Sequence, residues 1–105
     1  GTAVLRDRQM LSEDGLVVVV ATIDLKNKEI TAGPDILSRG FIYMRESEEL
    51  INEGRKVIFH AILSAMHEPT ANEHSIRNAV VSQLQRFLFE QTKRRPLILP
   101  MFIMI

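Results

Sequence analysis

The sequence predicts an α+β fold, with a small, mostly antiparallel sheet of three or four strands and two antiparallel helices on one face. Two observations support this prediction. Extended segments rich in β-branched residues occupy the first half of the chain, and two long segments of helical periodicity follow before a final apolar segment. Because strands and helices are segregated in the order β-β-β-α-α-β, they are expected to form separate layers. The length of 105 residues suits one domain.

The first half of the chain contains three predicted strands. Residues 16–23 include four consecutive valines, which disfavour a helix and favour a strand. Residues 29–32 form a short second strand, and 36–44 a third. The residue types at 33–35, Gly-Pro-Asp, predict a turn between the second and third strands. Gly40 interrupts the third segment and indicates a bulge or a close approach of two backbones.

The first helix is predicted over residues 48–66. Its apolar and small residues recur with the helical period, which indicates one buried face. Ser47 offers an N-cap hydroxyl, and Pro69 lies beyond the predicted end.

The second helix follows a predicted capping box formed by Thr70 and Glu73. Ile76, Val80 and Leu84 recur at helical spacing, and Pro96 ends the helix. Three cations are placed in its last turn, where positive charge suits the negative end of the helix dipole: Lys93, Arg94 and Arg95.

The last strand covers residues 97–105, and Pro100 within it predicts an edge position because proline cannot donate to a ladder. Side chains alternate along a strand, so the valine run places two valines on each side of the sheet. Two helices cover only one side. We therefore predict an interface on the other side or at the last strand's edge, with these candidates: Val17, Val18, Val19, Val20 and Ile103. An alternative cover is the parent protein's core or residues 1–15.

Composition excludes several classes of protein. Thirteen Lys and Arg balance thirteen Asp and Glu, which argues against a uniformly basic nucleic-acid-binding surface. The chain has no cysteine, so disulfides and thiolate chemistry are absent. Its longest apolar stretch, 97–105, is too short to cross a membrane. Because the chain begins with Gly1, we expect a piece of a larger cytoplasmic protein, with 1–15 as a linker and 16–105 as the domain.

No catalytic, cofactor-binding or metal-binding residue is predicted. His60, His67 and His74 fall seven residues apart, whereas helical metal pairs sit three or four apart. No serine lies in a G-x-S-x-G sequence, and no phosphate-binding glycine loop occurs. A cluster of glutamates at the start of the first helix is typical of a solvated, dipole-matched helix end: Glu46, Glu48, Glu49 and Glu53.

The basic run Lys93, Arg94 and Arg95 has two interpretations. It caps the second helix, or it contacts RNA phosphates with salt-dependent affinity. We prefer capping, because no aromatic interleaving is evident in the sequence.

Four stretches resemble the C-terminal domain of bacterial ribonuclease J. They are VLRDR at 4–8, LSEDGLV at 11–17, SRGFIYMRES at 38–47 and TKRRP at 92–96. The resemblance spans nearly all of the chain, and the stretch at 38–47 is its most specific part.

The resemblance implies a parent enzyme with a metallo-β-lactamase core and an inserted β-CASP domain. That core binds two metal ions, described as zinc, through a His-x-His-x-Asp-His sequence, and hydrolyses RNA as a 5′-to-3′ exonuclease and an endonuclease in mRNA decay and rRNA maturation. The motif is absent from this chain, so no metal ion is expected here and the chain is predicted to be non-catalytic.

What the resemblance implies for this domain is an accessory role in assembly and full activity. The implied partners are its own catalytic core, a second copy or a ribonuclease J paralogue, and the parent's RNA substrate. The alternative is an RNA-contacting module that uses the basic run at the end of the second helix.

Overall fold

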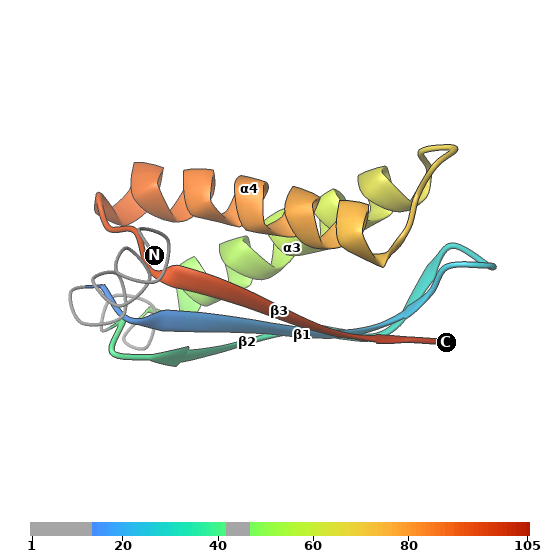
Figure 1. Ribbon diagram of the computed structural model, residues 1–105. Coiled ribbons are helices and arrows are strands. Elements are labelled where there is room, and N and C mark those ends of the chain that lie inside the picture. Colours follow the sequence, from blue (N-terminus) through green and yellow to red (C-terminus); the bar gives the residue numbers. More distant parts are fainter. Residues whose placement is uncertain (1–13, 42–46) are drawn as a thin grey trace, which may run out of the picture.

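The computed structural model describes residues 14–41 and 47–105, which form a three-stranded sheet with two helices on one face (Figure 1). The strands are β1 (Leu16–Asp24), β2 (Glu29–Arg39) and β3 (Leu97–Met104). The helices α3 (Glu48–Met66) and α4 (Glu73–Thr92) come between β2 and β3 in the chain. The predicted α+β class with a one-sided helix layer is therefore confirmed.

β1 is the central strand of the sheet, whose order is β2-β1-β3. It pairs with β2 antiparallel and with β3 parallel, so the sheet is mixed rather than mostly antiparallel. The path of the chain explains the parallel pair. After β2, α3 and α4 form an antiparallel helical pair that returns the chain to the end of the sheet where β1 begins, so β3 must run in the direction of β1 (Figure 1).

The prediction of a separate third strand over residues 36–44 is wrong for the part that the structure describes. Residues 29–39 form one strand, and the Gly33-Pro34 sequence lies inside it. Val20 pairs with Asp35 while Thr22 pairs with Ala32, so β2 uses one more residue than β1 over this stretch. This irregularity takes up the Gly-Pro pair as a bulge instead of a chain reversal. Residues 42–44 lie outside the described residues.

Gly40 and Gly15 account for the predicted close approach of two backbones. Both glycines have positive φ, 70° and 84°. A Cβ atom on Gly15 would lie 2.5 Å from the carbonyl oxygen of Arg39. Only glycine fits between the start of β1 and the end of β2.

α3 begins and ends where the sequence predicts. The Ser47 hydroxyl accepts a hydrogen bond from the Leu50 N–H at 3.0 Å, as expected of an N-cap. The last turn of α3 contains no basic residue. A cation comes instead from the β1–β2 hairpin, where the Lys28 ammonium donates a 2.6 Å hydrogen bond to the carbonyl oxygen of Met66.

Both ends of α4 differ from the prediction. Its capping box joins Asn72 and Ser75, not Thr70 and Glu73. The helix ends at Thr92, and Lys93 is the C-cap residue with a left-handed φ of 60°. The basic run thus follows the helix and does not occupy its last turn.

The core lies between the sheet and the helices. From β1 it takes Val17, Val19, Ala21 and Ile23, which alternate along the strand and are at most 2% exposed. Each fully buried aliphatic side chain contributes about 1.5–3 kcal/mol. The helices complete this layer with seven fully buried side chains: Ile58, Ile62, Met66, Ile76, Val80, Leu84 and Leu88.

Candidate functional site

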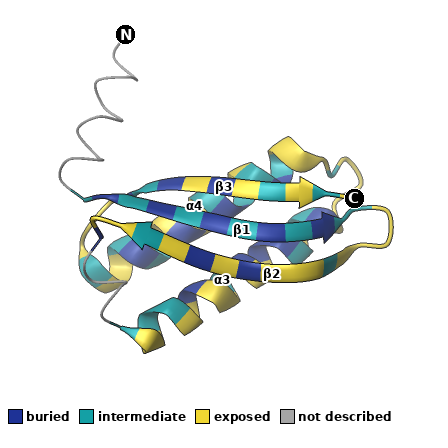
Figure 2. Cartoon of the chain, turned by 90° about the horizontal axis from the view of Figure 1, so that it is seen from below, coloured by how far each residue is buried: buried dark blue, intermediate teal, exposed yellow. Residues whose placement is uncertain are grey.

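The second face of the sheet is not covered by the described helices (Figure 2). We call it the open face and define it by its outward apolar side chains: Val18, Val20, Leu37, Leu99, Met101 and Ile103. Leu37 is 62% exposed, Met101 56% and Ile103 57%. Large apolar side chains exposed to this degree and grouped on one surface mark an interaction site.

Strand register joins these side chains into one continuous surface. Val18 pairs with Leu37 on one side and with Leu99 on the other. Two residues further along β1, Val20 pairs with Met101, and two residues beyond that, Thr22 pairs with Ile103. Paired residues share a face of the sheet, so the row Leu37-Val18-Leu99 is apolar across all three strands. In the next row, the β2 partner of Val20 is Asp35.

The open face is uncharged over β1 from residue 16 to 22 and over β3 from residue 97 to 103. On β2 the same face carries two exposed charged residues, Asp35 opposite Val20 and Arg39 opposite Leu16, and Asp35 lies 3.9 Å from Arg55 of α3. The uncharged part of the face, on β1 and β3, brings no like charges together when it meets a copy of itself, so this part suits a two-fold interface.

The predicted interface residues divide between the two faces. Val17 and Val19 have no exposed surface and belong to the core, whereas Val18, Val20 and Ile103 lie on the open face. Leu37, Leu99 and Met101 are not among the interface residues that the sequence predicts. Their signal was the two-residue alternation of β2 and β3, which places them on the same side as Val18 once the register is known.

β3 is an edge strand, as Pro100 predicts, but its outer edge is poorly suited to pairing. The Leu97 N–H donates to Gly15 and the Ile105 N–H to Ile23, each at 2.9 Å. The N–H groups of odd-numbered β3 residues therefore point toward β1, and those of even-numbered residues point toward solvent. Pro100 lies at an even position, so the outer edge lacks a donor near its middle.

The basic run after α4 packs around an aromatic ring. The Arg95 guanidinium lies 4.4 Å from the centre of the Phe89 ring, and the Lys93 ammonium lies 5.3 Å from it. The Arg95 N–H donates to Asp14 at 2.8 Å, and Arg94 lies 3.9 Å from the same carboxylate. The side chains thus sit over Phe89 and Asp14, while the helix end itself is closed by the Lys93 N–H bonded to Phe89 O at 2.8 Å.

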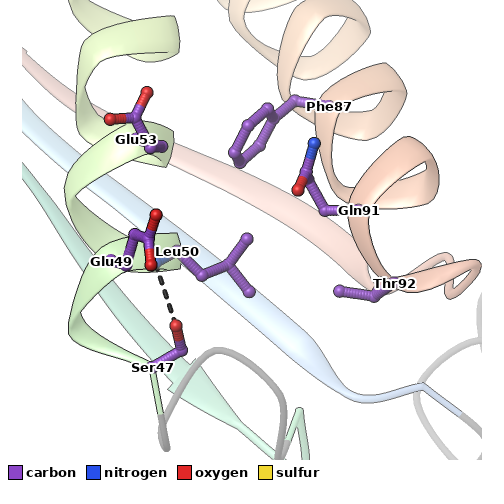
Figure 3. A pocket seen from close by; sticks show the side chains of 7 residues that line it. All are labelled: Ser47, Glu49, Leu50, Glu53, Phe87, Gln91 and Thr92. Carbon is purple, nitrogen blue, oxygen red and sulfur yellow. Dashed lines mark hydrogen bonds between the residues drawn. The ribbon is translucent and has the colours of Figure 1, made fainter.

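A shallow pocket of about 430 Å³ opens between the start of α3 and the end of α4 (Figure 3). Leu50 and Phe87 form its apolar part, and Glu49 and Glu53 stand on its α3 side. The Ser47 hydroxyl in this pocket is held by its N-cap bond, and Glu53 lies 3.2 Å from the Lys56 ammonium. No histidine is among the described residues that line the pocket, and the only titratable side chains among them are Glu49 and Glu53.

The three histidines do not converge. The Nδ1 atom of His67 lies 2.7 Å from the carbonyl oxygen of Leu63, and the Nε2 atom of His74 lies 3.2 Å from the Asn78 amide. Across residues 14–41 and 47–105, no group of three or more metal-binding side chains comes together. Over the same residues, neither helix is both long and apolar enough to span a bilayer.

Comparison with known proteins points to one family. The family model described as the ribonuclease J C-terminal domain matches residues 3–105. The chain is 54% identical over 103 residues to "Ribonuclease J 1" of Streptococcus pyogenes serotype M3, which covers 98% of this chain. It is 45% identical over 100 residues to "Ribonuclease J 2" of Staphylococcus saprophyticus and 44% identical to that of Staphylococcus aureus, each covering 95% of this chain. The chain spans 18% of the length of each of these relatives.

Proposed function

Because the chain belongs to the ribonuclease J family and corresponds to its C-terminal domain, we propose that it is an assembly and docking domain of a ribonuclease J. The observation that carries this proposal is the open face. It presents an apolar surface that covers β1 and β3 and extends to Leu37 of β2, and the described helices leave this surface uncovered. Burying such a surface against another copy or against the parent's core removes apolar area from water.

The structure favours the open face over the β3 edge as the contact surface. Pairing two β3 edges across a two-fold axis needs donors along the outer edge, and Pro100 supplies none there. Edge pairing also leaves Leu37 and Met101 in water. Packing two open faces together buries these side chains from both copies in one layer.

We further propose that the RNA chemistry belongs to the rest of the parent protein. In that proposal the parent is a cytoplasmic, metal-dependent 5′-to-3′ exo- and endoribonuclease of mRNA decay and rRNA maturation. Its two metal ions are held by its catalytic core, since the described residues of this chain offer no cluster of metal ligands. The partner on the open face is a second copy, a ribonuclease J paralogue or the parent's own catalytic core.

The direct test is sedimentation of the chain over a range of concentrations, in the presence and absence of RNA. We expect the wild-type mass to rise with concentration without RNA. Val18→Lys and Ile103→Lys place a charge on the open face and should keep the chain monomeric. Phe59→Lys makes a matched change at a 40% exposed aromatic residue of α3 and should leave association intact. A wild-type chain that stays monomeric at every concentration argues against self-association.

Docking on the core is tested in the whole ribonuclease. Val18→Lys in the full-length enzyme should lower its oligomeric mass and its activity on RNA together, while the domain stays folded by circular dichroism. Unchanged mass and activity in the folded Val18→Lys and Ile103→Lys enzymes would exclude the open face as an interface.

The isolated chain should show no nuclease activity. The assay is incubation with 5′-monophosphorylated RNA and Mn²⁺ or Mg²⁺. Metal-dependent cleavage that disappears on a point substitution within this chain would overturn the assignment of chemistry to the core.

A further inference from the structure

Phe89 lies at the centre of a small cationic surface on α4. Arg86 precedes it by three residues on α4, so these two side chains share one helix face. Lys93, the C-cap residue, brings its ammonium to 5.3 Å from the ring centre. Arg95 then folds back from the loop after α4 to 4.4 Å from the ring centre. We call these four residues, together with the adjacent Arg94, the Phe89 patch.

Charge in this segment is strongly one-sided. Residues 86–95 contain four cations and one carboxylate, that of Glu90. The carboxylate of Asp14, whose side chain is 16% exposed, adds one negative charge 3.9 Å from Arg94. Among the described residues of this region, Glu90 and Asp14 thus supply two negative charges against four positive ones. The charge balance of the whole chain hides this local excess.

The ring and the cations together have the chemistry that single-stranded nucleic acid requires. Phe89 is only partly buried. A base stacks on an aromatic ring or on the plane of an arginine, and phosphates contact the lysine and arginine charges around it. The sequence favours capping over RNA contact because it shows no aromatic interleaving. The structure brings the ring and the cations together through the left-handed turn at Lys93.

We propose that the Phe89 patch binds a short stretch of single-stranded RNA. Arg86 and Lys93 are seven residues apart, which is about 10 Å along a helix. That length matches roughly three nucleotides at a stacked rise of about 3.4 Å. The site lies on the helix layer, on the opposite side of the sheet from the open face, so it is a function separate from assembly (Figure 1).

The experiment is a fluorescence anisotropy titration of a labelled ten-nucleotide oligouridine with the chain, from low to moderate salt. Lys93→Gln with Arg95→Gln should weaken binding tenfold or more and reduce the slope of log K against log salt by about 1.4, since each lost contact contributes about 0.7. Phe89→Leu keeps an apolar side chain without the ring and should weaken binding at least fivefold. The matched control, Arg55→Gln with Lys56→Gln, removes two exposed cations from α3 and should change affinity less than twofold.

Three results would overturn the proposal. The first is no binding by the wild-type chain at low salt. The second is an equal loss in the control variant, which means diffuse electrostatics. The third is full affinity in Phe89→Leu together with equal binding of polyglutamate, which means a patch for acidic proteins. Thermal melts confirm that each variant is folded. Val18→Lys should bind RNA as the wild type does, so failure of the assembly proposal is distinguishable from failure of this one.

Discussion

Lys28 is the side chain whose removal tests the packing of the hairpin against the helix layer. It lies in the β1–β2 turn with φ 55°, and its ammonium donates to the Met66 carbonyl at the end of α3. Last-turn carbonyls of a helix lack partners within the helix, and they carry the negative end of its dipole. The Lys28 ammonium gives a last-turn carbonyl a hydrogen-bond donor and places a positive charge at the negative end of the dipole. The last turn of α3 has no basic residue of its own.

The substitution Lys28→Met removes the charge and the hydrogen bond but keeps an unbranched side chain and the same backbone demand at φ 55°. A hydrogen bond to a charged group contributes about 1.5–3 kcal/mol and a helix-end charge about 0.3–1 kcal/mol. The contact is partly buried, so solvent weakens both contributions. We expect a loss of about 1–2 kcal/mol, which for a domain of this size lowers Tm by roughly 5–12 °C.

The assay is urea unfolding followed by circular dichroism, with Lys26→Met as the matched control. Lys26 lies in the same hairpin and is exposed. Lys28→Arg should retain part of the stability because it keeps the charge. If Lys28→Met and Lys26→Met have the same free energy of unfolding, the bond to Met66 does not stabilise the domain.

Three further predictions concern other parts of the fold. Gly15→Ala should prevent stable folding or lower Tm severely, because a Cβ there would lie 2.5 Å from a backbone oxygen at positive φ; a variant with wild-type Tm in a thermal melt contradicts this close approach. Asn72→Ala removes the acceptor of the Ser75 N–H, at 2.8 Å, and should cost about 1 kcal/mol in urea unfolding; no loss would show that the capping box is dispensable. Hydrogen bonds from the backbone N–H and the side-chain amide of Asn27 lower the pKa of Asp24 below its ordinary value. The free energy of unfolding should therefore fall as pH drops below about 4 and through the lowered pKa, and Asp24→Ala should flatten that fall in acid titrations; an unchanged profile rejects the assignment.

The sequence by itself determined those elements whose local signals agree with their packing. α3 has both the bounds and the N-cap that its pattern predicts, since Ser47 and one apolar stripe act within a single helix. The valine run indicated a strand buried on one face with a second apolar face, because alternation depends only on local geometry. The four resembling stretches also indicated the family, which the comparisons confirmed.

Only the tertiary structure decided how distant segments meet. The Gly33-Pro34 pair predicts a turn locally, yet pairing with β1 on both sides of it keeps β2 as one strand with a bulge. The parallel partner of β1 follows from the return path of two helices, which no local pattern encodes. Lys28 of the β1–β2 hairpin reaches Met66 at the end of α3, although 38 residues separate them in the chain. The left-handed φ of Lys93 turns the chain so that Arg95 lies over Phe89. Such contacts depend on three-dimensional register, whereas propensity and periodicity report only on neighbours along the chain.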